Sequence, residues 1–213
     1  MKKLFLFALA GLAIFSCKKD ESYARFEPDS YLLHYDETVE LNLVSSESNH
    51  LFSYFQDADN IEISSDGVVK GKYVGELTVV AKYNDLSAQC YVNVEPYENL
   101  YRMAPLIERG MNRETIKSLE TGMGRDTLAS SMPNVLTIQP SEDKDRELRL
   151  MEYMFENNRL IAVVATLRAD VNRTRIDKFI AERYPLKKGG YEDAVSGATV
   201  SYNEIGNKIE YVW

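Results

Sequence analysis

The residues that most often carry catalytic and metal-binding chemistry are scarce in this sequence. The 213-residue chain has two histidines, His34 and His50, and neither lies at a spacing typical of zinc ligands. The sequence also lacks a nucleophile elbow and a glycine-rich phosphate-binding loop. These absences predict a protein that is not an enzyme, with no catalytic residues and no bound metal.

Positive charge is also limited. Lys and Arg number 25 against 33 Asp and Glu, so the formal net charge is −8 at pH 7, and no basic cluster stands out. Because phosphate contacts require clustered Lys and Arg, this composition argues against nucleic acid as a partner. With 45% hydrophobic and 27% charged residues, the chain is otherwise typical of globular proteins.

Long hydrophobic runs are missing apart from residues 4–15, and that run is too short for a membrane-spanning helix, which needs ~20 apolar residues. Lys2 and Lys3 precede the run and the small residue Ser16 follows it, a pattern typical of a cleaved export signal. Residues 1–16 are therefore predicted to be a signal peptide. The sequence Ile14-Phe15-Ser16-Cys17 resembles a lipobox of the looser form seen in Bacteroidota lipoproteins, and this resemblance implies lipid attachment at Cys17.

The residues that follow Cys17 bear on location. Residues 18–21 resemble the charged tract with which lipoproteins of these bacteria reach the outer face of the outer membrane. The resemblance implies a surface-exposed, lipid-anchored outer-membrane protein, with 17–25 as its tether and the membrane as a partner through the acyl chains. The alternative is a signal peptide cut nearby, with Cys17 unmodified. Acylation of Cys17 would leave Cys90 without a disulfide partner, so Cys90 is expected to be a small core residue.

Apolar and polar residues alternate between positions 26 and 95, as expected of half-buried strands. Turn-forming residues separate the strands and no helical period appears, which favours a β-sandwich. The stretch around Gly67, Gly71 and Gly75 resembles the late strands of bacterial immunoglobulin-like group 2 (BIG2) domains, although the usual middle-strand tryptophan is missing. The resemblance implies a spacer or an adhesive module.

Residues 101–213 mix helical and strand periods after a short linker near Pro96. Asn112 is expected to cap one helix, and Asp170 or Asn172 is expected to open another. The strands are expected at 135–139, 148–155, 160–167 and in a C-terminal hairpin. Antiparallel strands with helices on one face form an α+β domain. The alternating charges of residues 141–149 favour a solvated loop.

Residues 193–199 resemble the D-x-x-S/T-G-A-T flavinylation motif, in which FMN is joined to the threonine through a phosphoester. The resemblance implies FMN on Thr199, with Asp193, Gly197 and Ala198 as recognition elements. The context opposes this assignment, because a β-hairpin follows the motif where that family has a helix. The alternative is a loop or bulge at Ser196-Gly197 inside a strand pair.

Two function classes follow. The favoured one is a non-enzymatic surface lipoprotein without a cofactor, whose BIG2-like domain lifts a second domain towards a glycan, a peptide or an envelope protein. The alternative is an extracytoplasmic electron-transfer protein with FMN on Thr199. The expected fold has two domains, an all-β immunoglobulin-like sandwich at 26–95 and an α+β domain at 101–213, with an antiparallel sheet and helices on one face.

Overall fold

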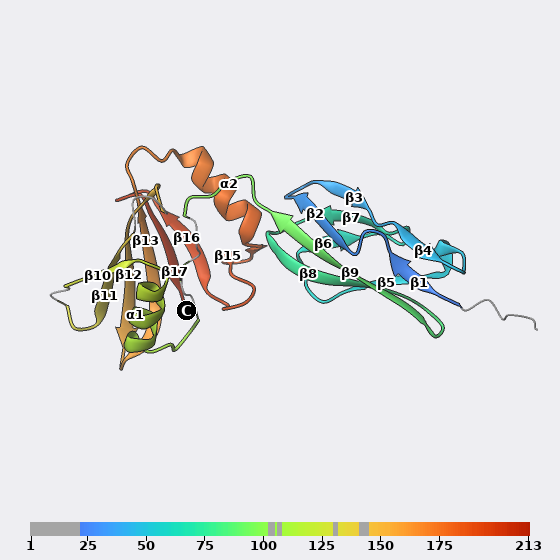
Figure 1. The fold of residues 1–213 in the computed structure, drawn as a ribbon. Coiled ribbons are helices and arrows are strands. Elements are labelled where there is room, and N and C mark those ends of the chain that lie inside the picture. The colour runs from blue at the N-terminus through green and yellow to red at the C-terminus, as the bar shows by residue number, and fades with distance from the viewer. Residues whose placement is uncertain (1–21, 102–104, 106–107, 130–131, 141–144) are drawn as a thin grey trace, which may run out of the picture.

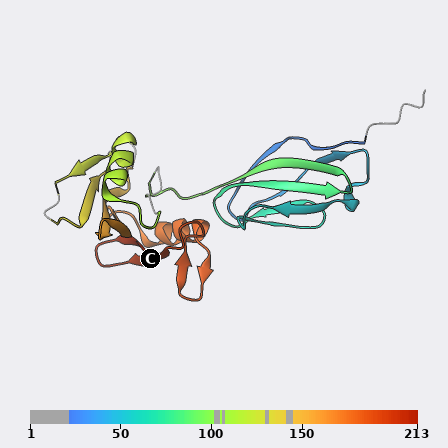
Figure 2. The ribbon, with the colours of Figure 1, turned by 90° about the horizontal axis from the view of Figure 1, so that it is seen from below.

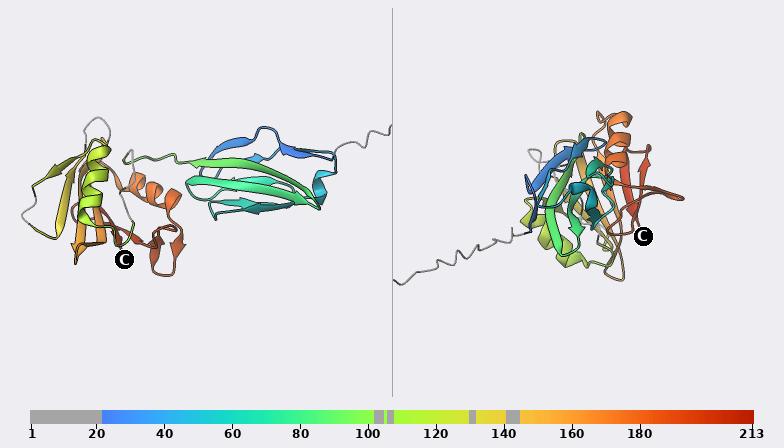
Figure 3. Two further views of the ribbon diagram at one scale, coloured as in Figure 1. Left: turned by 60° about the horizontal axis from the view of Figure 1, so that its bottom comes forward. Right: turned by 90° about the vertical axis from the view of Figure 1, so that its right-hand side faces the viewer.

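The computed structural model describes residues 22–101, 105, 108–129, 132–140 and 145–213. Strands dominate and form several sheets, which fall into two groups with separate hydrophobic cores (Figure 1, Figure 2 and Figure 3). Across these described ranges, no helix has the length and apolar character needed to span a bilayer. The predicted signal peptide and Cys17 lie outside the described residues.

The N-terminal group contains three sheets around one core. The four-stranded sheet has the order β2-β9-β8-β5, the three-stranded sheet has the order β3-β7-β6, and β1 pairs with β4. Only β2 and β9 pair in parallel among these strands. The elements are β1 (Ala24–Phe26), β2 (Ser30–His34), β3 (Thr38–Glu40), β4 (Leu43–Ser45), the 3₁₀ helix η1 (Asn49–Leu51), β5 (Ser53–Gln56), β6 (Ile61–Ile63), β7 (Val68–Gly71), β8 (Gly75–Tyr83) and β9 (Leu86–Glu95).

The predicted alternation of apolar and polar residues along the strands determines which side chains are buried in this core. Val79 and Cys90, which are paired across β8 and β9, are both fully buried, so Cys90 is the core residue that was expected. Gly67 has a φ of +79°, which only glycine adopts freely, and lies in the turn before β7. A Cβ atom at Gly71 would lie 2.7 Å from the carbonyl oxygen of His34, so no larger residue fits there.

The C-terminal group contains one antiparallel sheet of eight strands, in the order β10-β11-β12-β13-β17-β16-β15-β14. The two-residue turn Asn157-Asn158 has positive φ at both positions, as a type I′ hairpin requires, whereas residues 204–207 form a four-residue loop in which Gly206 and Asn207 have positive φ. The strands are β10 (Asp126–Leu128), β11 (Val135–Gln139), β12 (Leu148–Glu156), β13 (Arg159–Leu167), β14 (Leu186–Lys187), β15 (Gly190–Glu192), β16 (Thr199–Asn203) and β17 (Lys208–Val212).

Two helices cover one face of this sheet. Helix α1 (Arg113–Gly122) begins at Asn112 and α2 (Arg173–Arg183) begins at Asn172, and each asparagine side chain accepts a hydrogen bond from a backbone N–H of the first turn. Ile116 of α1 and Phe179 of α2 share a core with inward-facing sheet residues such as Tyr211. The cap at Asn112 was predicted from the sequence, and of the two candidates for the second cap, Asp170 and Asn172, the structure has Asn172.

Some details of the sequence prediction were wrong. Strands β10 and β14 were not expected, because each has only two or three residues and shows no detectable period. Leu119 follows the buried Ile116 of α1 by three residues, a spacing that places both on one helix face, yet Leu119 is exposed. The charged stretch 141–149 was expected to be solvated, yet Asp145 is buried, because Arg125 reaches it from twenty residues earlier in the chain.

Candidate binding groove

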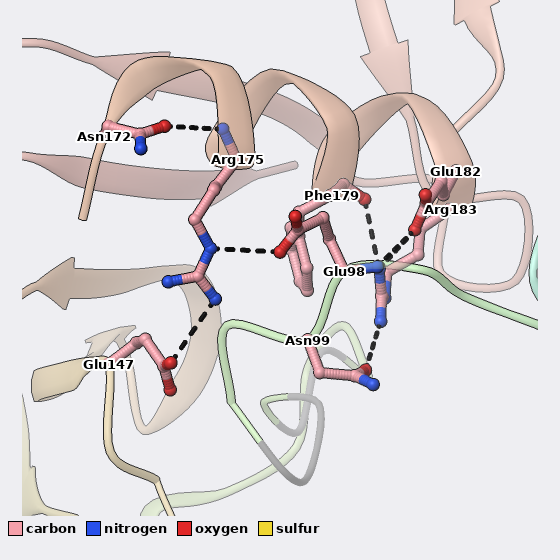
Figure 4. A network of polar contacts seen from close by, with 8 residues as sticks. All are labelled: Glu98, Asn99, Glu147, Asn172, Arg175, Phe179, Glu182 and Arg183. Carbon is pink, nitrogen blue, oxygen red and sulfur yellow. Dashed lines mark hydrogen bonds and ion pairs between the residues drawn. The ribbon is translucent and has the colours of Figure 1, made fainter.

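Helix α2 and the segment that follows β9 are joined by polar contacts (Figure 4). The Nε of Arg175 donates to Glu98 Oε2 over 3.0 Å, and its Nη2 donates to Glu147 Oε1 over 3.3 Å. Arg175 follows the cap residue Asn172, so its side chain leaves the first turn of the helix towards the linker. These contacts fix the linker against the C-terminal group.

The last turn of α2 also forms a polar contact with the linker. Arg183 Nη2 donates to Asn99 Oδ1 over 2.8 Å, and the guanidinium lies 4.0 Å from the centre of the Phe179 ring (Figure 4). Burial lowers the pKa of Arg183, because a desolvated cation is less stable than a hydrated one. The stacked ring and the amide oxygen of Asn99 hold the arginine in one orientation.

Glu182 connects the two groups of sheets. Its side chain is buried, and its Oε2 accepts a hydrogen bond from the backbone N–H of Glu98 over 3.0 Å. Its backbone oxygen accepts from the N–H of Val74 over 2.8 Å, a residue of the N-terminal group. The end of α2 is therefore bonded both to the linker and to the segment between β7 and β8.

A groove of about 610 Å³ lies beside this junction. The N-terminal group contributes Asp59, Lys72 and Tyr73 to its walls. The C-terminal group contributes Arg183 from α2, Leu186 and Lys187 from β14, and Val195 from the loop between β15 and β16. A cleft of this volume between two packed units is a common location for a binding site.

Two aliphatic side chains stand out in this groove. Leu186 is 69% exposed and Val195 is 98% exposed, which places them among the most exposed large hydrophobic residues of the described chain. Three cationic side chains accompany them, those of Lys72, Arg183 and Lys187, against the single carboxylate of Asp59. The groove therefore combines apolar surface with an excess of positive charge in an acidic protein.

Strand β14 forms one end of the eight-stranded sheet, because β15 is its only partner among the strands that the structure describes. Figure 1 places β15 close to α2, on the side of the sheet nearest the N-terminal strands. An edge strand presents backbone N–H and C=O groups that can pair with another extended chain. Sequence reasoning missed this site, because its walls come from segments more than a hundred residues apart.

The structure places the predicted flavin-attachment residue at the start of a strand. Thr199 is the first residue of β16 and is exposed. The preceding motif residues form the turn: Asp193 Oδ1 accepts from the N–H of Ser196 over 2.7 Å, and Gly197 has a φ of +69°. These hydrogen bonds explain Asp193 and Gly197 as turn residues, and FMN on Thr199 stays a prediction.

The other candidate residues lie apart from the groove. His34 stacks on Tyr97 with ring centres 4.8 Å apart, and Ser48 lies 2.7 Å from His50 Nδ1. Burial raises the pKa of the Cys90 thiol to about 11, so this cysteine is protonated and unreactive near neutral pH. Among the residues that the structure describes, no cluster of His, Cys, Asp and Glu has the form of a metal site.

No family model and no curated protein matches this chain. Two solved structures of the surface layer protein SbsC are similar to it: domains 4–9, at 10% identity and a TM-score of 0.30, and domains 5–6, at 11% and 0.28. The matches cover 89% and 88% of this chain, but 26% and 80% of those chains. TM-scores this low do not establish a shared fold.

Proposed function

We propose that this protein is a non-enzymatic lipoprotein of the cell envelope that binds a partner protein in the groove between its two groups of sheets. In this proposal, Cys17 carries the lipid and the N-terminal sheets form a BIG2-like, immunoglobulin-like domain that acts as a spacer. The α+β domain that follows supplies most of the binding surface. The observation that carries the proposal is the exposure of Leu186 and Val195 at the groove.

Exposed aliphatic side chains that lie together are typical of interaction surfaces, because leaving them in water costs free energy that a partner can recover. Burying a leucine side chain is worth ~1.5–3 kcal/mol, which corresponds to about tenfold to hundredfold in affinity. Leu186 and Val195 come from separate segments, and both line the same groove. They are therefore expected to contribute most of the binding energy.

The open edge of β14 and the positive charge suggest what kind of partner fits. An extended segment can add to an edge strand through backbone hydrogen bonds, and its side chains then occupy alternating pockets. Lys72 and Lys187 favour carboxylates, while Leu186 and Val195 favour aliphatic residues. The partner is expected to offer an extended peptide segment that carries both acidic and aliphatic side chains.

Selection from a random displayed peptide library against the purified protein tests this proposal. The selected peptides are expected to combine aliphatic with acidic residues, and to lose at least about tenfold in affinity on Leu186→Asp or Val195→Asp. The matched control is Ile205→Asp, since Ile205 is 86% exposed and does not line the groove. Selected peptides whose affinity is unchanged by Leu186→Asp and Val195→Asp would contradict the groove assignment. Peptides whose affinity falls equally on Ile205→Asp would contradict it as well.

The anchor is tested separately. The native protein is expected to have lost residues 1–16 and to gain the mass of attached acyl chains, and Cys17→Ser should abolish both changes. Protease added to intact cells should degrade the protein if it lies at the surface. Recovery of an unprocessed, lipid-free chain from membranes would refute the lipoprotein proposal, whatever the groove binds.

A further inference from the structure

The four-stranded sheet of the N-terminal group has one face in the core and one face in solvent. Residues of β8 alternate between the two: Leu77, Val79 and Ala81 are buried, while Glu76 faces outward. The outward face also carries three large hydrophobic side chains, Leu32, Phe55 and Tyr91, which are 60%, 53% and 61% exposed. Leu32 and Tyr91 lie on the neighbouring strands β2 and β9, whereas Phe55 lies on β5 at the other edge of the sheet, so Tyr91 is the one of the three that lines the depression described next.

A depression of about 440 Å³ lies on this face, within the range of small-molecule sites. The side chain of Tyr91 lines it, and polar residues surround the ring. Thr78 lies opposite Tyr91 on the neighbouring strand, and Glu76 lies opposite Asn93. The register thus places an aromatic ring and several polar groups within a few ångströms of each other.

Most of these polar groups are available to a ligand. The side chains of Glu76 and Asn93 form no hydrogen bond or ion pair with other described residues, and both line the depression. Asp57 also lines it, with Oδ1 accepting from the N–H of Thr78 over 2.8 Å, which leaves its second carboxylate oxygen unengaged by described residues. The wall therefore offers two carboxylates, an amide, a hydroxyl and a tyrosine ring.

We propose that this depression is a binding site for an uncharged saccharide. The face of a sugar ring carries C–H groups that pack against an aromatic ring, while its edge carries hydroxyls that donate to carboxylates and bond to amides. Both requirements are met here by Tyr91 and by Asp57, Glu76 and Asn93. Acidic saccharides are disfavoured, because the described lining has carboxylates and no Lys or Arg.

This site does not depend on the groove proposed above. The groove has a cationic and aliphatic lining, whereas this depression has an acidic and aromatic one. The two surfaces also lie on different elements, since only the depression involves the outward face of β8 and β9. If no ligand binds at one of the two sites, the proposal for the other site is therefore unaffected.

Titration with uncharged hexasaccharides of glucose, mannose and N-acetylglucosamine tests the proposal, with calorimetry and ligand-observed NMR as readouts. At least one probe is expected to bind with a Kd below about 1 mM. Tyr91→Ala should weaken binding by about fivefold or more, Tyr91→Phe should retain most of it, and Glu76→Gln should weaken it through the lost acceptor charge. Tyr97→Ala is the matched control, because Tyr97 is a similarly exposed tyrosine outside the depression.

Circular dichroism melts are needed to check that each variant is folded. Folding is expected, because all these side chains are exposed enough to be replaced without loss of the core. Absence of binding by every probe at about 10 mM would overturn the proposal. An equal effect of Tyr97→Ala and Tyr91→Ala would also overturn it. So would a change of oligomeric state on Tyr91→Ala without a change in saccharide binding, which would make this face an interface between copies of the chain.

Discussion

The buried arginine of the C-terminal group permits a sharp test of the structure. Arg125 is almost fully buried, and its Nε and Nη2 donate to the two carboxylate oxygens of Asp145 over 2.8 and 3.0 Å. Its Nη1 donates to Glu120 Oε2 over 3.0 Å, and the hydroxyl of Tyr153 donates to the other oxygen of Glu120. Burial by itself lowers the pKa of Arg125, but the hydrogen bonds and charges of these two carboxylates outweigh burial and raise the pKa above its usual value.

Replacing Arg125 with methionine keeps an unbranched aliphatic stem and removes the guanidinium group with its charge. Glu120 and Asp145 then stay in the interior without this cation, and breaking a buried ion pair in this way costs ~3–5 kcal/mol. By contrast, Arg173→Met removes ion pairs to Asp177 and Glu204 whose partners are all at least half exposed, so it should cost at most about 1 kcal/mol. The two variants remove the same charge from different environments.

Urea unfolding followed by tryptophan fluorescence measures this difference. Trp213 is the only tryptophan, and its Nε1 donates to the backbone oxygen of Ser196 over 2.9 Å, so its emission reports on the C-terminal group. For a slope of ~1.5 kcal/mol per molar urea, Arg125→Met should lower the midpoint by about 2–3 M.

Equal midpoints for Arg125→Met and Arg173→Met would refute the reasoning. Such a result would mean that Arg125 is hydrated, or that Asp145 lies in solvent, as the charge pattern of 141–149 first indicated. A triple replacement of Arg125, Glu120 and Asp145 by apolar residues of similar size provides the complement. It should recover much of the lost stability, because no unpaired charge is then left at this site.

Three further predictions concern other parts of the chain. Burial raises the pKa of Tyr184 to about 12 and the pKa values of Tyr101 and Tyr211 well above 10, so the unfolded chain loses these protons first as the pH rises. Stability should therefore decline from about pH 10 to about pH 12, and tyrosinate absorbance should appear together with unfolding. Arg175→Ala should cost only about 1 kcal/mol, because its ion pairs are partly exposed, but should speed protease cleavage of the linker several-fold. If FMN is attached at all, native protein co-expressed with a flavin transferase should gain one FMN mass that Thr199→Ala abolishes, and a colourless protein at the polypeptide mass would exclude it.

Much of the local structure could be read from the sequence. The hairpin at Asn157-Asn158 and the cap at Asn172 depend on residues a few positions apart, whose backbone preferences act within one turn. The burial of Val79 and Cys90 follows from a strict period of two along the strands. These features need no knowledge of the rest of the chain.

The binding surfaces could not be read in this way. Lys72 and Leu186 both line the groove, and Ser30 and Tyr91 both line the depression on the sheet. Each surface therefore depends on which distant segments pack together. The burial of Arg125 likewise could not be predicted. In the sequence, a buried charged residue in a polar stretch looks the same as a solvated one, and only the position of its partner distinguishes them.

The sequence by itself determined the longer strands, the hairpin turn at Asn157-Asn158 and the helix cap at Asn112, because each is fixed by periodicity and by backbone preferences within a few residues. The tertiary structure alone decided that Leu186 and Val195 share a groove, that Tyr91 stands beside Glu76 and Asn93, and that Asp145 is buried. The physical reason is that exposure and proximity are properties of packed surfaces, and packing depends on contacts between segments far apart in the chain.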